Sequence, residues 1–143
     1  MSFRLALVAV FAGLLPVGTQ AQSVQDAPSS LFVELNTVED IDGGCRFTFV
    51  ARNGTGQAID TAMFEAVVFD SSDRVATLSL FNFRELPVDR VRVRQFRIPD
   101  LSCSNVGQVL INGVNRCVVG GAESEICSDA LSLSSRTEME LLG

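Results

Sequence analysis

The four cysteines are the residues of this 143-residue chain with the most distinctive chemistry. They are Cys45, Cys103, Cys117 and Cys127. An even number of cysteines in an exported chain is typical of disulfide bonds, here two. The competing interpretation is a metal site made of all four thiolates, but such sites usually contain a Cys-x-x-Cys pair, which this spacing lacks. We therefore predict two disulfides and no metal.

The residue types that the chain lacks exclude most catalytic chemistry. It has no His and no Lys, and all 11 basic residues are Arg. Ser-His-Asp and Cys-His nucleophiles, Schiff bases and imidazole-bound metals are therefore excluded, and no glycine-rich phosphate loop is present. A pair of carboxylates remains available, as in glycosidases, but nothing marks a particular pair. We predict that the protein is not an enzyme and has no cofactor.

One acidic segment resembles a fragment of a calcium-binding loop. Residues 39–44 read Glu-Asp-Ile-Asp-Gly-Gly, which clusters carboxylates beside a turn. Calcium prefers such oxygen ligands, but the further ligands and the terminal Glu of a calcium loop are missing. We interpret the segment as an acidic hairpin turn.

The first 21 residues have the pattern of a secretory signal peptide. Arg4 precedes the apolar run 5–15, which is shorter than the roughly 20 residues that a membrane-spanning helix needs. Small residues at Thr19 and Ala21 then suit cleavage before Gln22. An uncleaved anchor or a buried helix is the alternative. Because 11 Arg without Lys also suggest a GC-rich bacterial genome, we expect a periplasmic or secreted bacterial protein.

After a polar, flexible lead-in at 22–30, apolar residues recur at every second position, as in half-buried β-strands. Turn-forming residues separate seven such runs, at 31–36, 45–52, 62–69, 75–83, 90–98, 106–112 and 136–142. Only 123–132 suggests a short helix. Seven short strands in about 110 residues are typical of an all-β, immunoglobulin-like Greek-key β-sandwich. We predict this fold for 31–143, with no membrane span.

The predicted fold favours one disulfide pairing. Cys45 begins the second strand and Cys103 directly precedes the sixth, and in a Greek-key sandwich these starts lie at the same end of opposite sheets. We therefore expect Cys45–Cys103, with Cys117–Cys127 closing a local loop between the last two strands. The number of cysteines alone allows three pairings.

Three features carry a family resemblance. They are a strand ending in Ala-Arg-Asn-Gly-Thr at 51–55, the run Phe-Glu-Ala-Val-Val-Phe-Asp at 64–70, and a hairpin into Val75. Through them, residues 45–112 resemble exported immunoglobulin-like modules of the FxLYD and CARDB kind, although Ala66 stands where that motif has Phe. The whole chain is also similar to small exported alphaproteobacterial proteins. The resemblance implies an immunoglobulin-like module and supplies no active site.

Three arginines occupy alternate positions, Arg90, Arg92 and Arg94. A strand would place them on one face about 7 Å apart, where together with Arg97 they could bind an acidic partner or a polyanion. The alternative is a solvated face paired with acidic residues across the sheet. Because Phe96 and Ile98 continue the apolar side in the other phase, we expect a bulge at Gln95.

Two neighbouring strands carry more apolar residues than one face can bury. If Ala66 and Val68 face the core, and Leu78 and Leu80 do so on the next strand, four apolar side chains point outward. They are Val67, Phe69, Phe81 and Phe83. An exposed patch of this kind is typical of a protein interface. Alternatively, 123–135 covers it, or a bulge near Phe81 turns the rings inward.

These patterns predict a non-enzymatic binding module whose partner is a protein. The net charge of −6 argues against nucleic acid and anionic membranes as partners. Asn53-Gly54-Thr55 fits the N-glycosylation pattern, but we interpret it as a turn. A structural envelope protein without a discrete ligand is the alternative function, followed by a carboxylate enzyme.

Overall fold

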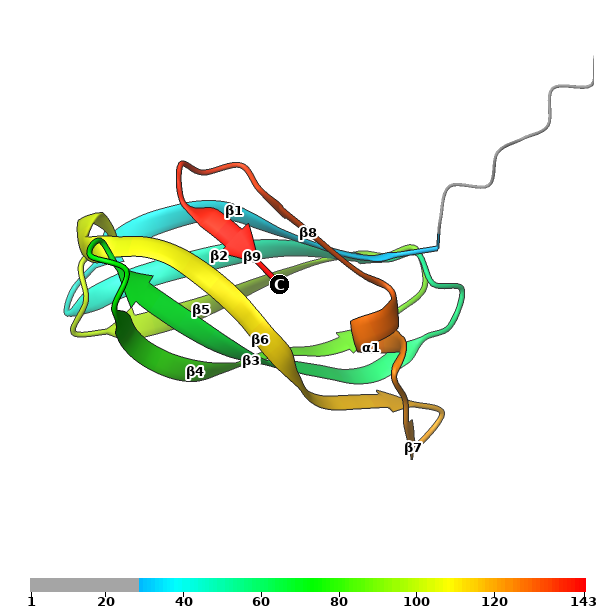
Figure 1. Cartoon of the computed structure of the whole chain (residues 1–143). Helices are drawn as coiled ribbons and strands as arrows, with labels where there is room; N and C mark the ends of the chain where they lie inside the picture. The colour runs from blue at the N-terminus through cyan, green and yellow to red at the C-terminus, as the bar shows by residue number, and fades with distance from the viewer. Residues whose placement is uncertain (1–28) are drawn as a thin grey trace, which may run out of the picture.

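The computed structural model describes residues 29–143, in which two layers of strands enclose one core (Figure 1). The predicted signal peptide, and all but the last two residues of the lead-in, lie outside the described residues. In chain order the elements are β1 (Leu31–Ile41), β2 (Gly44–Asn53), β3 (Ile59–Asp70), β4 (Val75–Leu86), β5 (Val91–Pro99), the 3-10 turn η1 (Cys103–Asn105), β6 (Val106–Val119), β7 (Ala122–Glu123), α1 (Ile126–Asp129), β8 (Leu131–Ser135) and β9 (Glu140–Leu142). The predicted all-β sandwich is therefore confirmed.

The strands form two sheets. One has the order β5-β2-β1-β8, and the other has the order β4-β3-β6-β7, with β9 also paired to β6. All pairs are antiparallel except β8 on β1 and β9 on β6. No helix in the described part of the chain is long and apolar enough to cross a membrane.

Only the end of the predicted final strand, 136–142, is a strand, β9, and the predicted start at 136 is wrong. The structure has two short strands instead, β8 in one sheet and β9 in the other. Between them the chain turns, because the Ser135 hydroxyl donates to the Met139 carbonyl over 2.6 Å and the Thr137 hydroxyl donates to the same oxygen over 3.2 Å. The expected helix at 123–132 is reduced to the single turn α1. The other six predicted strands are present, several of them longer than expected.

Phenylalanine rings from both sheets fill the centre of the core. Phe47 and Phe49 of β2 meet Phe81 and Phe83 of β4, with ring centroids 5.6 to 6.3 Å apart. These four rings are fully buried. Since burying one such side chain contributes up to about 3 kcal/mol, this cluster is a principal source of stability.

Two disulfides join segments that the sheets leave apart. Cys45 at the start of β2 is bonded to Cys103 in η1, and Cys117 of β6 is bonded to Cys127 in α1. Both predicted pairings are confirmed. The first bond links the start of a strand in one sheet to the segment that leads into β6 of the other, and the second fixes α1 and the beginning of β8 to β6.

Candidate functional site

The predicted aromatic patch is wrong in its β4 half, because Phe81 and Phe83 are fully buried. β4 alternates in the opposite phase from the one expected: Leu78 and Leu80 are 61% and 52% exposed. The physical reason is the length of the phenylalanine side chain. A phenylalanine on this edge strand spans the gap to the other sheet, as Phe81 does when it stacks on Phe96 of β5 with centroids 4.4 Å apart.

Val67 and Phe69 do point away from the core. Val67 lies opposite Leu78 on β4 and Leu110 on β6, and Leu110 lies opposite Leu142 on β9. We call these four side chains the outer apolar row; it crosses four strands in register. Val67 in the middle is only 7% exposed, because its neighbours cover it, while Leu78 and Leu142 at the ends are 61% and 39% exposed.

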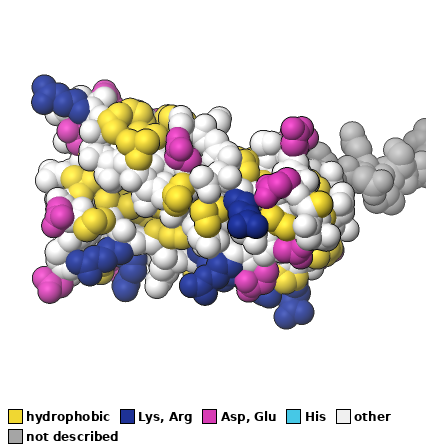
Figure 2. Space-filling model, turned by 90° about the horizontal axis from the view of Figure 1, so that it is seen from below, with side chains coloured by type: hydrophobic (Ala, Val, Ile, Leu, Met, Phe, Trp, Pro, Cys, Tyr) yellow, Lys and Arg dark blue, Asp and Glu magenta, His cyan; other side chains and the backbone are white. Residues whose placement is uncertain are grey.

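Further apolar side chains extend the outer apolar row along β4. Leu80 is half-exposed, and Val75 is paired with Phe69 across the strands. Figure 2 views the molecule from below, which is the side on which Figure 1 draws β4. Hydrophobic side chains are distributed among polar ones along the length of this face of the molecule (Figure 2). The structure thus replaces the expected surface of four residues with a longer one centred on Val67.

The arginine strand also has the opposite phase from the one expected. Arg92 and Arg94 lie opposite Ala51 and Phe49, both fully buried, so they occupy the inner side of β5. The register between β2 and β5 is regular across Gln95, so the predicted bulge is absent. Arg90 lies just before β5 and is exposed.

The remaining predicted arginine does not join the others. Arg97 points to the outer side of β5, where it lies opposite Arg46 and donates to the Asp42 carbonyl over 2.8 Å. The outer side of β5 also carries Gln95, Pro99 and two apolar side chains, Val91 and Val93, which are 47% and 55% exposed. The predicted surface of four arginines on one face is therefore wrong.

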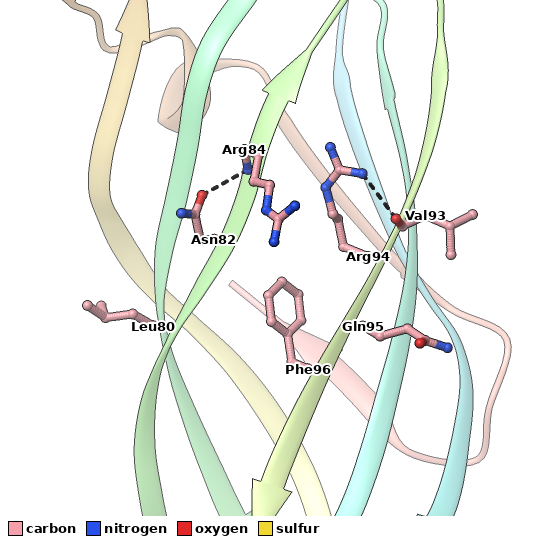
Figure 3. A pocket seen from close by; sticks show the side chains of 7 residues that line it. All are labelled: Leu80, Asn82, Arg84, Val93, Arg94, Gln95 and Phe96. Atoms are coloured by element: carbon pink, nitrogen blue, oxygen red, sulfur yellow. Dashed lines mark hydrogen bonds between the residues drawn. The ribbon is translucent and has the colours of Figure 1, made fainter.

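A groove of about 700 Å³ opens between the edges of β4 and β5 (Figure 3). Its lining residues are Leu80, Asn82, Arg84, Val93, Arg94, Gln95 and Phe96. Figure 3 shows the Phe96 ring and the Arg94 guanidinium between the two strands, while Val93 and Gln95 point away from β4. The groove is apolar at Phe96 and basic at Arg84 and Arg94.

Arg94 bridges the groove. Its guanidinium donates to the backbone carbonyls of Phe83 over 2.7 Å and Glu85 over 3.3 Å, and forms an ion pair with the Glu85 carboxylate at 3.5 Å. The pKa of Glu85 is held below its ordinary value, chiefly by a hydrogen bond from its own backbone N–H and further by the charges of Arg94, Arg92 and Arg84. One arginine thus occupies two backbone carbonyls that β4 would otherwise expose.

The acidic segment at 39–44 forms the predicted hairpin turn between β1 and β2. Gly43 has a φ of 71°, which favours glycine, and the Asp40 carboxylate accepts a hydrogen bond from the Cys103 backbone over 2.7 Å. Within residues 29–143, no three acidic or cysteine side chains come close enough to hold a metal ion.

Asn53 has a structural role that its sequence motif did not reveal. Its side chain is fully buried, and its amide donates to the carbonyls of Gln57 over 2.6 Å and Leu86 over 2.7 Å. Its oxygen accepts from the backbone and the hydroxyl of Thr55. Both amide protons are in use, and the bond from the Thr55 N–H to the Asn53 oxygen fixes the chain locally at 53–55.

Three comparisons with known proteins were negative. A scan against protein-family models and searches of curated proteins and of solved structures found no match. The hairpin at 70–75 that contributed to the family resemblance is present between β3 and β4.

Proposed function

We propose that this protein is an exported, non-enzymatic interaction module with an immunoglobulin-like fold. The arrangement of strands supports that fold: β1, β2 and β5 share one sheet, and β3 and β6 share the other, as strands A, B, E and C, F do in immunoglobulin domains. β4 takes the position of the added strand of variable-type domains. The chain departs from the immunoglobulin arrangement at its C-terminal end, where β8 and β9 are both in parallel pairs.

Export to the periplasm or beyond is supported by the chemistry of the cysteines. All four are in disulfides, and these persist in oxidising compartments. The signal-peptide pattern at 1–21 agrees with this location.

The observation that carries the interaction function is the outer apolar row. Leu78, Val67, Leu110 and Leu142 are consecutive cross-strand neighbours, and nothing in residues 29–143 folds over the exposed ends of the row. Contiguous apolar surface on a soluble domain marks sites of protein contact. The partner is a protein surface of matching apolar character.

Site-specific photo-crosslinking in the native organism tests the proposal. A photoreactive residue replaces Leu78 in the outer apolar row, and the control replaces Ser132, which is exposed on β8 in the other sheet. We expect a discrete adduct with one protein from position 78 and none from position 132. Equal, diffuse labelling from both positions would instead favour a structural protein without a discrete ligand.

A further inference from the structure

Within residues 29–143, one edge of β5 has no strand partner, and hydrogen bonds fix which of its backbone groups face that edge. Asp100 N–H donates to the Gly43 carbonyl over 3.0 Å, which makes residues 43 and 100 a bonded pair. In an antiparallel ladder the bonded pairs recur every two residues, so the even-numbered residues of β5 bond to β2. The N–H and C=O groups of Val91, Val93 and Gln95 therefore point away from β2.

Two further observations agree with this phase. Pro99, which has no N–H, occupies an odd-numbered position, where a missing donor costs no ladder bond. The carbonyls of Val91 and Val93 accept hydrogen bonds from the side chains of Arg92 and Arg94, each over 3.2 Å, instead of from a neighbouring strand. The edge is thus open to a strand of another chain.

The side chains of β5 define what an added strand must carry. On the outer face it would lie beside Val91 and Val93, which are about half exposed. On the inner face it would lie beside Arg92 and Arg94 and, farther along, the ring of Phe96 in the groove (Figure 3). Because side chains alternate along a strand, apolar residues must alternate with acidic ones.

Charge supports an acidic partner. Residues 84–94 contain four arginines and two acidic residues, in a chain whose net charge is −6. Of these arginines only Arg94 has an ion pair within residues 29–143; Arg84, Arg90 and Arg92 have none. Figure 2 shows arginine side chains gathered along one border of the face that it views.

The same features disfavour two other arrangements. A second copy of β5 would place arginine opposite arginine, and like charges directly opposite destabilise a strand pair. The edge of β4 is less available, since Arg94 reaches across from β5 to the carbonyls of Phe83 and Glu85 and also pairs with the Glu85 carboxylate. On β5, among the described residues, the carbonyls of Val91 and Val93 accept only from the side chain of the residue that follows each of them.

We propose that β5 binds an extended partner segment of alternating apolar and acidic residues, which adds to its free edge as a strand. This surface is separate from the outer apolar row, so the proposal does not depend on that row. The carboxylates of the segment pair with Arg92 and Arg94, and its apolar side chains cover Val91 and Val93.

Synthetic peptides test the inference against the full exported protein. The probe is Val-Glu-Val-Glu-Val-Glu-Val; the controls are Val-Val-Val-Val-Glu-Glu-Glu, which keeps the composition but not the alternation, and Val-Lys-Val-Lys-Val-Lys-Val. Inorganic polyphosphate serves as a polyanion without a peptide backbone. We expect the first peptide alone to bind, with its affinity falling as salt is added. Equal binding of the block peptide or of polyphosphate would overturn strand addition.

Two variants, each with a matched control, locate the binding. Val93→Pro removes an N–H from the free edge without touching the β2 ladder and should abolish binding; Val93→Thr keeps the N–H and should bind normally. Arg92→Glu should weaken binding at least about tenfold, because it places like charges opposite each other. Arg116→Glu makes the same change of charge at an exposed position on β6 and should have little effect.

Amide hydrogen exchange gives the decisive readout. The amides of Val91, Val93 and Gln95 should gain protection when the peptide binds, and those of β4 should not. Protection confined to β4 would contradict the assignment to β5. Leu78→Asp in the outer apolar row should leave peptide binding unchanged. Failure of strand addition at β5 can therefore be distinguished from failure of the proposed function, which depends on the outer apolar row.

Discussion

The two long edges of the sandwich are completed by different interactions. On one edge β8 pairs with β1, the chain crosses between the sheets, and β9 pairs with β6, so backbone hydrogen bonds cover both layers (Figure 1). On the other edge, β4 and β5 have no further strand partners in the described part of the chain. Side chains connect them there, chiefly Arg94 and the stacked rings of Phe81 and Phe96. We call these the closed edge and the open edge.

The difference shows how one small domain separates stability from availability for binding. Backbone pairing at the closed edge covers Leu31–Leu35 of β1 and Gln108–Leu110 of β6, and it fixes the C-terminal segment. At the open edge, aromatic rings exclude water from the core, while the outward-facing backbone groups of β5 have no strand partner within residues 29–143. Unpaired edges invite further strands, and arginines on β5 restrict which strands can add.

Phe81→Ala should cause the greatest loss. The ring is fully buried and seals the open edge by stacking on Phe96, so we expect a loss of about 3–5 kcal/mol in the free energy of unfolding, measured by urea denaturation. The adjacent Leu80 is half-exposed, and Leu80→Ala should change the same quantity by less than about 0.5 kcal/mol. Similar losses from the two variants would refute the phase of β4 described above.

Removing the second disulfide should weaken the closed edge selectively. The Cys117→Ala, Cys127→Ala double variant opens a loop with a sequence separation of 10, and the expected loss is about 3 kcal/mol. Because this bond fixes α1 beside β6, amides of β8 should exchange faster, while those of β4 and β5 change little. Uniform acceleration across both sheets would show that the two edges are not independent.

Two adjacent leucines of β9 should differ. Leu141 faces the core and is 9% exposed, whereas Leu142 is 39% exposed. Leu141→Ala should therefore lower the free energy of unfolding by about 2 kcal/mol, and Leu142→Ala by less than about 0.5 kcal/mol. Equal denaturation midpoints would mean that β9 does not contribute to the core.

Arg94→Ala removes the bridge across the open edge. It leaves the carbonyls of Phe83 and Glu85 without a side-chain donor, so we expect a loss of about 1 kcal/mol. Arg92→Ala is the matched control, because its guanidinium contacts only the preceding carbonyl of Val91, and thermal unfolding should hardly change. A larger loss of stability from Arg92→Ala than from Arg94→Ala would mean that Arg94 is not the residue that connects the two strands.

Asp70 begins the hairpin that leads into β4, and its effect depends on pH. Its carboxylate accepts hydrogen bonds from the backbone N–H groups of Arg74 and Ser72, which lower its pKa from the ordinary 3.8. A lowered pKa in the folded state stabilises the fold above pH 3.8, and this contribution disappears as the pH falls through the folded value. The urea midpoints of wild type and Asp70→Ala should therefore differ slightly at neutral pH and converge in acid. Asp70→Asn keeps an acceptor oxygen but does not titrate, so its difference from wild type should be smaller than that of Asp70→Ala and should also shrink as the pH falls.

How far the sequence predicts this molecule depends on where a strand lies. Alternation identified the central strands correctly, because β2 and β3 have a neighbour on each side and a buried row of apolar residues. It failed on β4 and β5, where both faces carry apolar residues. There the larger Phe81, Phe83 and Phe96 reach the core, and Leu78, Leu80 and Val93 stay outside. The candidate surfaces were therefore found on the right strands but with several wrong side chains.

Local periodicity, turn residues and composition were enough to predict the class of fold, the positions of six strands and the disulfide pairing that this fold favours. They also exclude histidine and lysine chemistry. The buried face of each edge strand, the division of the last segment between two sheets and the position of the unpartnered edge of β5 emerged from the three-dimensional packing. Those features depend on the distance that a side chain must span between the layers and on pairings between residues far apart in the chain, and neither is encoded in local sequence patterns.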